Sequence, residues 1–364
     1  MYDAVIIGGG LAGSLAARRL ATHGWKVAVV EQHQFARGKV CGECLSALGI
    51  ETLKRSGLAD SVLDVAPARL TRAFLHAADA SSEVSLRGEM WGVSRTALDA
   101  LLLNAARGAG AEILQPARAE LIRAGEVVIR DLRTNEQKVI TARQILLADG
   151  KGALLTERPA ATSDFGIKAH FIGVEAERDA IGLYGVGQSY GGVAPIEGDR
   201  WNAAFSVSVE TLSESRGRLD ELFESIQRQN PTLRLHFRRA RRVGEWCSSP
   251  LPRFGVMDEW PAGVIPIGNA AGALEPIGGE GMGLALRSAE LAVEAMLENP
   301  ERPNLASLRR EYRKLWTIRR FACRTAALAL SSPTFARPTV ELLAGNEMIA
   351  SIALRLMGKR AVGG

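Results

Sequence analysis

Residues 3–31 read DAVIIGGGLAGSLAARRLATHGWKVAVVE, and this stretch decides the fold. Its apolar, β-branched run 4–7 predicts a short, buried, parallel strand. The strand leads into the pattern G-x-G-x-x-G. In that pattern Gly8 permits a tight turn, Gly10 lets the backbone approach a pyrophosphate, and Gly13 lets the following helix pack closely on the strand. We therefore expect a diphosphate to rest on the N-terminus of that helix.

The rest of the stretch completes a strand, helix, strand unit. Leucines and alanines predict a helix that ends at Gly24, and 26–30 predicts the second strand. Glu31 follows the loop by about twenty residues, where an acid is expected to accept hydrogen bonds from a ribose. These elements in this order predict a Rossmann-type domain that binds an adenine dinucleotide.

The composition is that of an ordinary globular protein. The chain has 364 residues, 47% of them hydrophobic, which is enough for about two or three domains with substantial cores. The net charge of +5 is a small excess. Its one dense basic cluster, 238–242, is interpreted as a solvated face, with an anionic partner such as a nicotinamide dinucleotide phosphate as the alternative. We expect no nucleic-acid partner.

Cysteine content and the start of the chain suggest a cellular location. The four cysteines, Cys41, Cys44, Cys247 and Cys323, do not make a disulfide framework in a chain of this length. The first strand begins close to Met1, which leaves no room for a secretory signal, and no apolar run reaches the ~18 residues of a spanning helix. We expect a cytoplasmic protein.

Two further segments are expected to complete a ligand site. An apolar strand over 144–148 ends at Asp149 and Gly150, which would present a carboxylate at the carboxyl edge of the sheet, where ligands bind. Another strand, 264–267, runs into a turn, and the glycine-rich segment 276–283 then opens a helix. Such a start exposes backbone N–H groups and the positive end of the helix dipole.

These elements together resemble the FAD-dependent group that contains para-hydroxybenzoate hydroxylase, geranylgeranyl reductase and the flavin halogenases, over about residues 1–300. The resemblance implies one non-covalently bound FAD. Asn269 departs from the group, which has an aspartate there; the amide keeps a carbonyl acceptor and loses a full charge. The helix start at 279–282 is suited to hold the negative charge of a reduced flavin. The resemblance assigns cofactor binding to Gly8, Gly10, Gly13, Glu31, Arg95, Asp149, Gly150, Asn269, Pro276, Gly279, Gly281 and Met282.

The predicted fold class is α/β, a Rossmann-type FAD-binding domain with an inserted antiparallel β-sheet substrate domain and C-terminal helices. Alternating residues predict the strands of the inserted sheet. We expect two amphipathic helices at the C-terminus, over 305–331 and 338–357, which pack against the FAD-binding domain; peripheral membrane contact is the alternative. The expected boundaries are 1–67, 91–165 and 255–304 for the FAD-binding domain, 68–90 and 166–254 for the substrate domain, and 305–364 for the C-terminal helical segment.

Short motifs point to different members of the group. Residues 40–43, VCGE, resemble a segment of geranylgeranyl reductases, which places Cys41 close to the flavin as the candidate catalytic residue, and 42–45 resembles the Gly-Glu-Ser-Leu of halogenases. Residues 190–195, YGGVAP, align with the reductases' Tyr-Gly-Trp-x-Phe-Pro and give Tyr190 and Pro195 as candidate substrate residues. Glycine and alanine replace its Trp and Phe. The halogenase Trp-x-Trp-x-Ile-Pro fails in the same way, so halogenation ranks last.

The predicted reaction is that of an NADH- or NADPH-dependent monooxygenase, which captures oxygen as a flavin C4a-hydroperoxide and hydroxylates an aromatic or polyketide-like molecule. One alternative is the reduction of isoprenoid double bonds. Another is a flavin disulfide reductase that uses Cys41 and Cys44, although no second dinucleotide fingerprint accompanies the pair. A metal site is not expected, because no second cysteine or histidine pair is present. A plain electron carrier would not need the inserted sheet.

Overall fold

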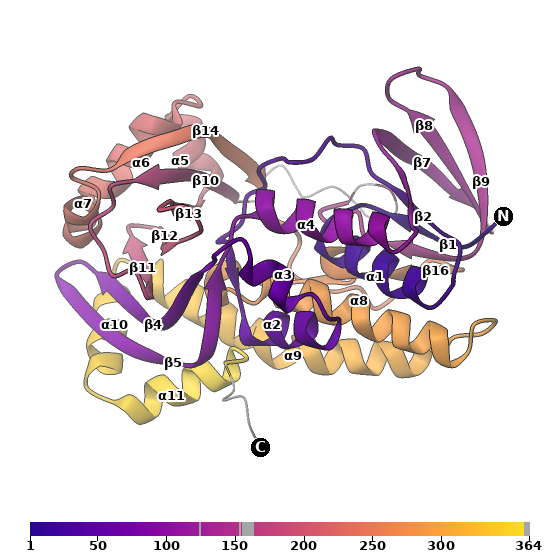
Figure 1. The fold of residues 1–364 in the computed structure, drawn as a ribbon. Helices are drawn as coiled ribbons and strands as arrows, with labels where there is room; N and C mark the ends of the chain where they lie inside the picture. The colour runs from indigo at the N-terminus through magenta and orange to yellow at the C-terminus, as the bar shows by residue number, and fades with distance from the viewer. Residues whose placement is uncertain (124, 153, 155–163, 360–364) are drawn as a thin grey trace.

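The computed structural model describes residues 1–123, 125–152, 154 and 164–359. Figure 1 shows two large sheets with helices packed between and beside them, and a long helix followed by two short ones at the C-terminal end. The expected α/β fold class, with a Rossmann-type unit, a second sheet and C-terminal helices, is confirmed. The domain boundaries stay a prediction.

The first sheet is built on the N-terminal strand. Its strands are β1 (Tyr2–Ile7), β2 (Val27–Val30), β6 (Glu112–Leu114), β7 (Ala117–Arg123), β8 (Glu126–Asp131), β9 (Gln137–Leu147) and β16 (Val264–Pro266). The fully buried run 4–6 places β1 in the centre, where it pairs in parallel with β2 and β9. The outer strands β6 and β16 are also parallel, whereas β9 continues into an antiparallel meander with β8 and β7. Ligand-binding turns therefore follow β1, β9 and β16 at one edge.

Three helices cover this sheet and share its core. They are α1 (Leu11–Thr22), α4 (Arg95–Gly108) and α8 (Gly281–Glu298). Leucines at 15 and 20 of α1, and at 98 and 102 of α4, are buried together with Ala289, Ala292 and Val293 of α8. Two short helices, α2 (Ala47–Arg55) and α3 (Ala59–Leu63), pack beside α8 and α4. This packing fixes the N-termini of α1 and α8 near the ends of the parallel strands.

The second sheet has the order β14-β10-β13-β12-β11-β4-β5-β3. Its strands are β3 (Cys44–Leu45), β4 (Ala68–Ala77), β5 (Ala80–Gly92), β10 (Phe165–Ile172), β11 (Ala180–Val186), β12 (Ser189–Pro195), β13 (Trp201–Val207) and β14 (Arg241–Pro250). Neighbouring strands are antiparallel, as expected, except that β4 and β11 pair in parallel. A parallel pair is possible there because the two strands come from separate segments of the chain and need no hairpin between them.

Two expectations about helices are corrected. The sequence over 216–228 predicts one helix between the last strands of the second sheet, whereas the structure has three there, α5 (Val209–Glu214), α6 (Leu219–Arg228) and α7 (Pro231–His236). The helix expected over 338–357 is two, α10 (Ala336–Ala344) and α11 (Glu347–Leu356). The break falls at Gly345 and Asn346, where the Asn346 side chain accepts a hydrogen bond from the Ile349 amide and caps the new helix.

The C-terminal helices contact both parts of the molecule. The long helix α9 (Leu305–Leu330) packs beside α8 and against the short pair β15 (Gly255–Val256) and β17 (Gly272–Ala273). Figure 1 shows α10 and α11 turning back under β4 and β5, which they contact. Within the described residues, no helix is both long and apolar enough to cross a membrane.

Candidate functional site

One large cavity brings most of the predicted site residues together. Its volume is about 1430 Å³, and it is lined by the segments that follow strands of the first sheet, by strands of the second sheet and by α9 to α11. Ligand pockets usually have volumes of about 300–1,000 Å³, so this cavity is larger than a pocket for one small ligand. The predicted residues on its wall are Gly10, Cys41, Arg95, Asp149, Gly150, Tyr190, Asn269, Pro276, Gly279, Gly281 and Met282.

Gly8 and Gly13 lie behind this wall and shape it. A Cβ on Gly13 would lie 1.9 Å from the carbonyl oxygen of Gly8, and a Cβ on Gly8 would lie 2.3 Å from that of Ala148. Gly8 also has φ +107°, a conformation that favours glycine. The close approach of helix and strand predicted from the fingerprint is therefore present, and only glycine fits at either position.

The carboxylate of Glu31 is hydrogen-bonded to the backbone around it. Its buried carboxylate accepts hydrogen bonds from the Gly9 amide at 2.8 Å and from the His33 amide at 2.7 Å, and it is not among the residues that line the cavity. These bonds tie the end of β2 to the glycine loop. The ribose contact expected of Glu31 stays a prediction.

A pair of cations lies beside Gly10. A Cβ on Gly10 would lie 3.2 Å from Lys39 Nζ and 3.9 Å from Arg95 Nη2. Both cations share one acid, because Asp99 Oδ2 is 2.8 Å from Arg95 Nη2 and 3.4 Å from Lys39 Nζ. Burial lowers the pKa of the Lys39 ammonium, and the charge of Arg95 lowers it further. The site thus has surplus positive charge at the N-terminus of α1, which suits an anion.

Sequence reasoning missed Lys39. Lys39 lies in a loop without a recognised motif. Its position soon after Glu31 is the one feature of the sequence that could have indicated a role in the site. Arg95, in contrast, was predicted, and the structure brings it to the same place.

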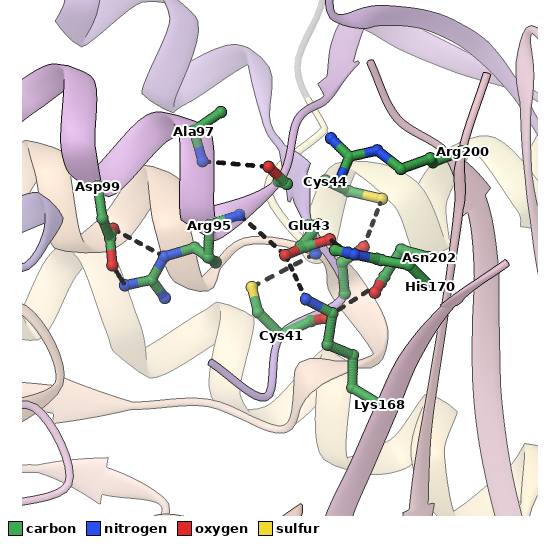
Figure 2. A network of polar contacts seen from close by, with 12 residues as sticks. Cys41, Glu43, Cys44, Arg95, Ala97, Asp99, Lys168, His170, Arg200 and Asn202 are labelled. Atoms are coloured by element: carbon green, nitrogen blue, oxygen red, sulfur yellow. Dashed lines mark hydrogen bonds and ion pairs between the residues drawn. The ribbon is translucent and has the colours of Figure 1, made fainter. Parts of the chain in front are cut away.

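Glu43 joins the loop after β2 to the second sheet, as Figure 2 shows. Its carboxylate is fully buried and lies 2.6 Å from Lys168 Nζ and 2.6 Å from His170 Nε2, both on β10, and it accepts a hydrogen bond from the Arg95 amide at 2.8 Å. Burial alone would raise the pKa of this carboxyl, but the hydrogen bond from His170 and the charge of Lys168 hold it below its usual range. Glu43 therefore carries a buried negative charge that fixes the loop.

The backbone of Glu43 supports the same conclusion. Its φ is +56°, which is uncommon for a residue with a Cβ and costs about 1–3 kcal/mol. The surrounding contacts must outweigh that cost. Sequence reasoning gave Glu43 no role; a lysine inside the apolar strand around 165–172 was the one signal that a buried partner exists.

The two cysteines of the loop differ in their surroundings. Both are free and both line the cavity, Cys41 half-buried and Cys44 buried. Cys44 donates to the Gly42 carbonyl at 3.3 Å, and burial raises its thiol pKa to about 12. A thiol that stays protonated is a poor nucleophile, so the structure gives little support to a dithiol redox pair.

The glycine-rich segment before α8 forms the floor of the cavity. Gly279 has φ +62° and follows the turn η2 (Pro276–Gly278), after which α8 begins. Asn269 is exposed on the cavity wall in η1 (Gly268–Ala270). The N-terminus of α8 thus lies where donor groups for a negative charge were predicted.

Two buried acids beside this segment are paired with the C-terminal helical segment. Glu275 accepts from the Tyr190 hydroxyl at 2.9 Å and lies 2.9 Å from Arg324 Nη1 on α9. Glu280 lies 2.7 Å from Lys359 Nζ, and both side chains are buried. The C-terminal segment is therefore fixed to the floor of the cavity by ion pairs as well as by packing.

Only one of the two substrate residues predicted from 190–195 lines the cavity in the structure. Tyr190 lines the cavity, whereas Pro195 does not. Pro195 instead packs closely on Gly92, since a Cβ on Gly92 would lie 2.0 Å from the Pro195 carbonyl oxygen. Gly192 and Ala194 line the cavity and leave it wide. The remaining wall is mostly apolar, with Ala73, Leu75, Leu86, Ile181, Leu183 and Phe205 from the second sheet.

Comparison with known proteins places this geometry in a family. The family described as FAD binding domain matches residues 1–298. A menaquinone reductase of Mycolicibacterium smegmatis is 25% identical over 399 residues, which cover 98% of this chain and 91% of that protein. The FixC protein of Salmonella typhimurium is 27% identical over 350 residues, 84% of this chain and 79% of FixC.

Solved structures agree on the fold. The flavin-dependent brominase Bmp2 superposes with a TM-score of 0.79 at 20% identity, covering 99% of this chain and 96% of the brominase. A geranylgeranyl bacteriochlorophyll reductase-like protein of Thermoplasma acidophilum gives a TM-score of 0.78, also at 20% identity and with the same coverage. At this identity the likeness shows the fold alone. The family match covers most of the chain, and the chain therefore belongs to the FAD binding domain family, a group of FAD-dependent oxidoreductases.

Proposed function

We propose that the protein is an FAD-dependent reductase that saturates a double bond in a long, apolar, isoprenoid-type lipid, with NADH or NADPH as the electron donor. One observation carries the proposal. The cavity that is lined by the Gly10 loop and Cys41 is also lined by mostly apolar residues of α9, α10 and α11, and so extended an apolar wall suits a long chain better than a compact ring. The similarity of nearly the whole chain to menaquinone reductases supports the same substrate class.

The residues at one end of the cavity fit FAD. Gly10, Lys39 and Arg95 form a cationic cradle that a side chain at position 10 would fill, as a diphosphate requires. Asp149, Gly150 and Asn269 lie on the same wall, and the N-terminus of α8 faces it at Gly281. The chemistry that FAD supplies when bound is the transfer of a hydride equivalent between donor and acceptor.

The chain itself would position the lipid and supply a proton. Apolar side chains of the second sheet and α9 hold the lipid and exclude water from the reacting carbons. The net reaction adds one hydride and one proton across a carbon–carbon bond and oxidises one NADH or NADPH. Cys41 is the half-buried thiol on the cavity wall, and we assign it the delivery of that proton, which water then replaces.

Anaerobic turnover tests this reaction. The assay contains purified FAD-loaded protein, NADPH or NADH, and a geranylgeranyl lipid or menaquinone in detergent. We expect a product two hydrogens heavier than the substrate, with one product molecule formed for each nicotinamide oxidised. Exposing the menaquinone product to air distinguishes reduction of the quinone ring from reduction of the isoprenoid chain, because a quinol loses its two hydrogens again whereas a saturated chain keeps them. Turnover that requires oxygen and inserts it into the product would contradict the proposal.

Hydroxylation of an aromatic or polyketide-like molecule is the second candidate. Gly192 and Ala194 line the cavity without the bulk of the aromatic residues expected of a prenyl-binding wall, which leaves room for a flat ring. Against it, the apolar wall extends over α9, α10 and α11, farther than one flat ring would need. Oxygen consumption in step with product formation, measured in the same assay run under air, would favour this candidate.

The loop cysteines are expected to differ in function. Cys41→Ala should lower turnover by about 10²-fold or more, the scale of a lost proton donor, while FAD affinity changes little. Cys44→Ala should do less, because its protonated thiol is bonded to the Gly42 carbonyl. Steady-state kinetics and flavin titration measure the two effects separately. Equal, small effects of both changes would assign the pair to packing.

FAD retention is expected to weaken as the pH rises, because the Lys39 ammonium loses its charge. This ammonium has a pKa below the ordinary 10.5, so it loses its charge at a lower pH than a free lysine does. A bound diphosphate favours the charged form, and affinity should therefore fall as pH rises from neutrality toward 10.5. Flavin titration at several pH values measures this. Lys39→Met should bind FAD more weakly at neutral pH and show a flatter pH dependence; an unchanged profile would contradict the role.

A further inference from the structure

The last three helices expose an unusual number of large apolar side chains. Eight of the fourteen exposed ones in the described residues lie on them or on the turn between α9 and α10: Ile318, Phe321, Leu328, Phe335, Leu342, Met348, Ile352 and Leu356. Phe321 is 75% exposed and Met348 68%. Single exposed apolar residues are ordinary, but a concentration of them in one part of a surface marks an interaction site.

Half of these side chains also line the cavity. Ile318 and Phe321 on α9, Leu342 on α10 and Leu356 on α11 are both exposed and part of the cavity wall. Residues with both properties lie at the mouth. One mouth of the cavity therefore opens between the three helices. Its rim is mainly apolar and also includes the exposed Thr317 and Thr325 of α9, so an entering apolar molecule would meet a mostly apolar surface there.

The same segment has an excess of basic residues. From Arg313 to Arg355 the chain has seven arginines and lysines and two glutamates. Four of the seven are paired with acids: Arg313 with Asp258, Lys314 with Glu311, Arg324 with Glu275, and Arg337 with Asp79 and Glu341. Arg320 and Arg355 are exposed and directly precede Phe321 and Leu356 of the rim. Long basic side chains beside apolar ones are typical of helices that lie in the interface of an anionic membrane.

We propose that α9, α10 and α11 form a docking face for an anionic lipid bilayer, with the cavity mouth opening into its apolar layer. The basic surplus matches acidic headgroups, and the apolar rim matches the acyl region beneath them. A protein partner on this face would instead close the mouth. The proposal rests on exposed side chains and charge, and it holds whichever reaction the protein performs.

Vesicle sedimentation of the FAD-loaded protein without substrate tests the face. The wild type is expected to bind vesicles of phosphatidylcholine with an equal part of phosphatidylglycerol, to bind pure phosphatidylcholine less, and to be released by high salt. The variant Phe335→Ser, Met348→Ser, Ile352→Ser changes three exposed side chains that are outside the cavity wall. It should lower the partition coefficient by about tenfold or more, because three apolar anchors are lost.

A control variant changes three other exposed apolar residues, on or next to the strands of the first sheet: Leu121→Ser, Leu132→Ser, Val139→Ser. It should bind vesicles like the wild type, and thermal unfolding should show that both variants remain folded. The proposal is overturned if the wild type binds neither kind of vesicle, or if the control loses as much binding as the helix variant. It is also overturned if the wild type is a dimer that ignores vesicles and the helix variant is a monomer, since a second copy of the chain then covers the face.

Discussion

Glu43→Gln is expected to lower the free energy of unfolding by about 3–5 kcal/mol, the cost of leaving a buried charge without its partner. Lys168 is almost fully buried, and its ammonium lies 2.6 Å from Glu43 Oε1. A neutral amide keeps the shape of the carboxyl but cannot balance that charge. Urea denaturation of the two proteins, followed by circular dichroism, measures the difference.

Two control variants separate charge from general damage. Glu43→Gln combined with Lys168→Met removes both charges and should recover part of the lost stability. Glu301→Gln changes an acid that is 82% exposed and should alter stability by no more than about 0.5 kcal/mol. A loss below about 1 kcal/mol in the single Glu43 variant, or no recovery in the double variant, would show that the ion pair does not hold the loop.

The second large effect is expected at the glycine fingerprint. A methyl group on Gly13 would lie 1.9 Å from the Gly8 carbonyl oxygen, so α1 must move away from β1. Gly13→Ala should cost about 1–3 kcal/mol of stability, as other overpacked sites do. It should also displace the N-terminus of α1 and weaken FAD retention by about tenfold or more, the size of one lost anchoring interaction.

Gly108→Ala is the matched control for this change. A Cβ at Gly108 would meet nothing within 4 Å, and the residue ends α4. It should leave FAD retention unchanged and stability equal or up to about 1 kcal/mol higher. Dialysis followed by flavin absorbance, with a thermal melt of each protein, gives both quantities. Wild-type FAD retention in Gly13→Ala would contradict the role given to the close helix contact.

The sequence predicts those parts of the structure that depend on neighbouring residues. The strand, glycine loop and helix over 3–24 follow from local periodicity and from the conformations that only glycine adopts. The turn at Asp149 and Gly150 and the helix start near Gly281 are local in the same sense, and all reach the cavity.

Contacts between distant segments could not be predicted in this way. Glu43 and Lys168 are far apart in the chain, and neither side chain identifies its partner until β10 is placed beside the loop. The cavity wall combines α9, α10 and α11 with strands from the middle of the chain, so its shape depends on packing that sequence periodicity does not predict. The break between α10 and α11 at Gly345 could have been predicted from the sequence, since glycine followed by asparagine favours a helix end and a new N-cap.

Anaerobic stopped-flow oxidation of the reduced flavoprotein tests the central claim most directly, because it isolates transfer from the protein to the lipid. We expect menaquinone or a geranylgeranyl lipid in detergent to restore the oxidised flavin spectrum at a rate that increases with lipid concentration, and one lipid per FAD to be recovered two hydrogens heavier after exposure to air. Reduced protein that neither lipid reoxidises, while oxygen reoxidises it and hydroxylates an aromatic compound, would contradict the assignment as a lipid reductase.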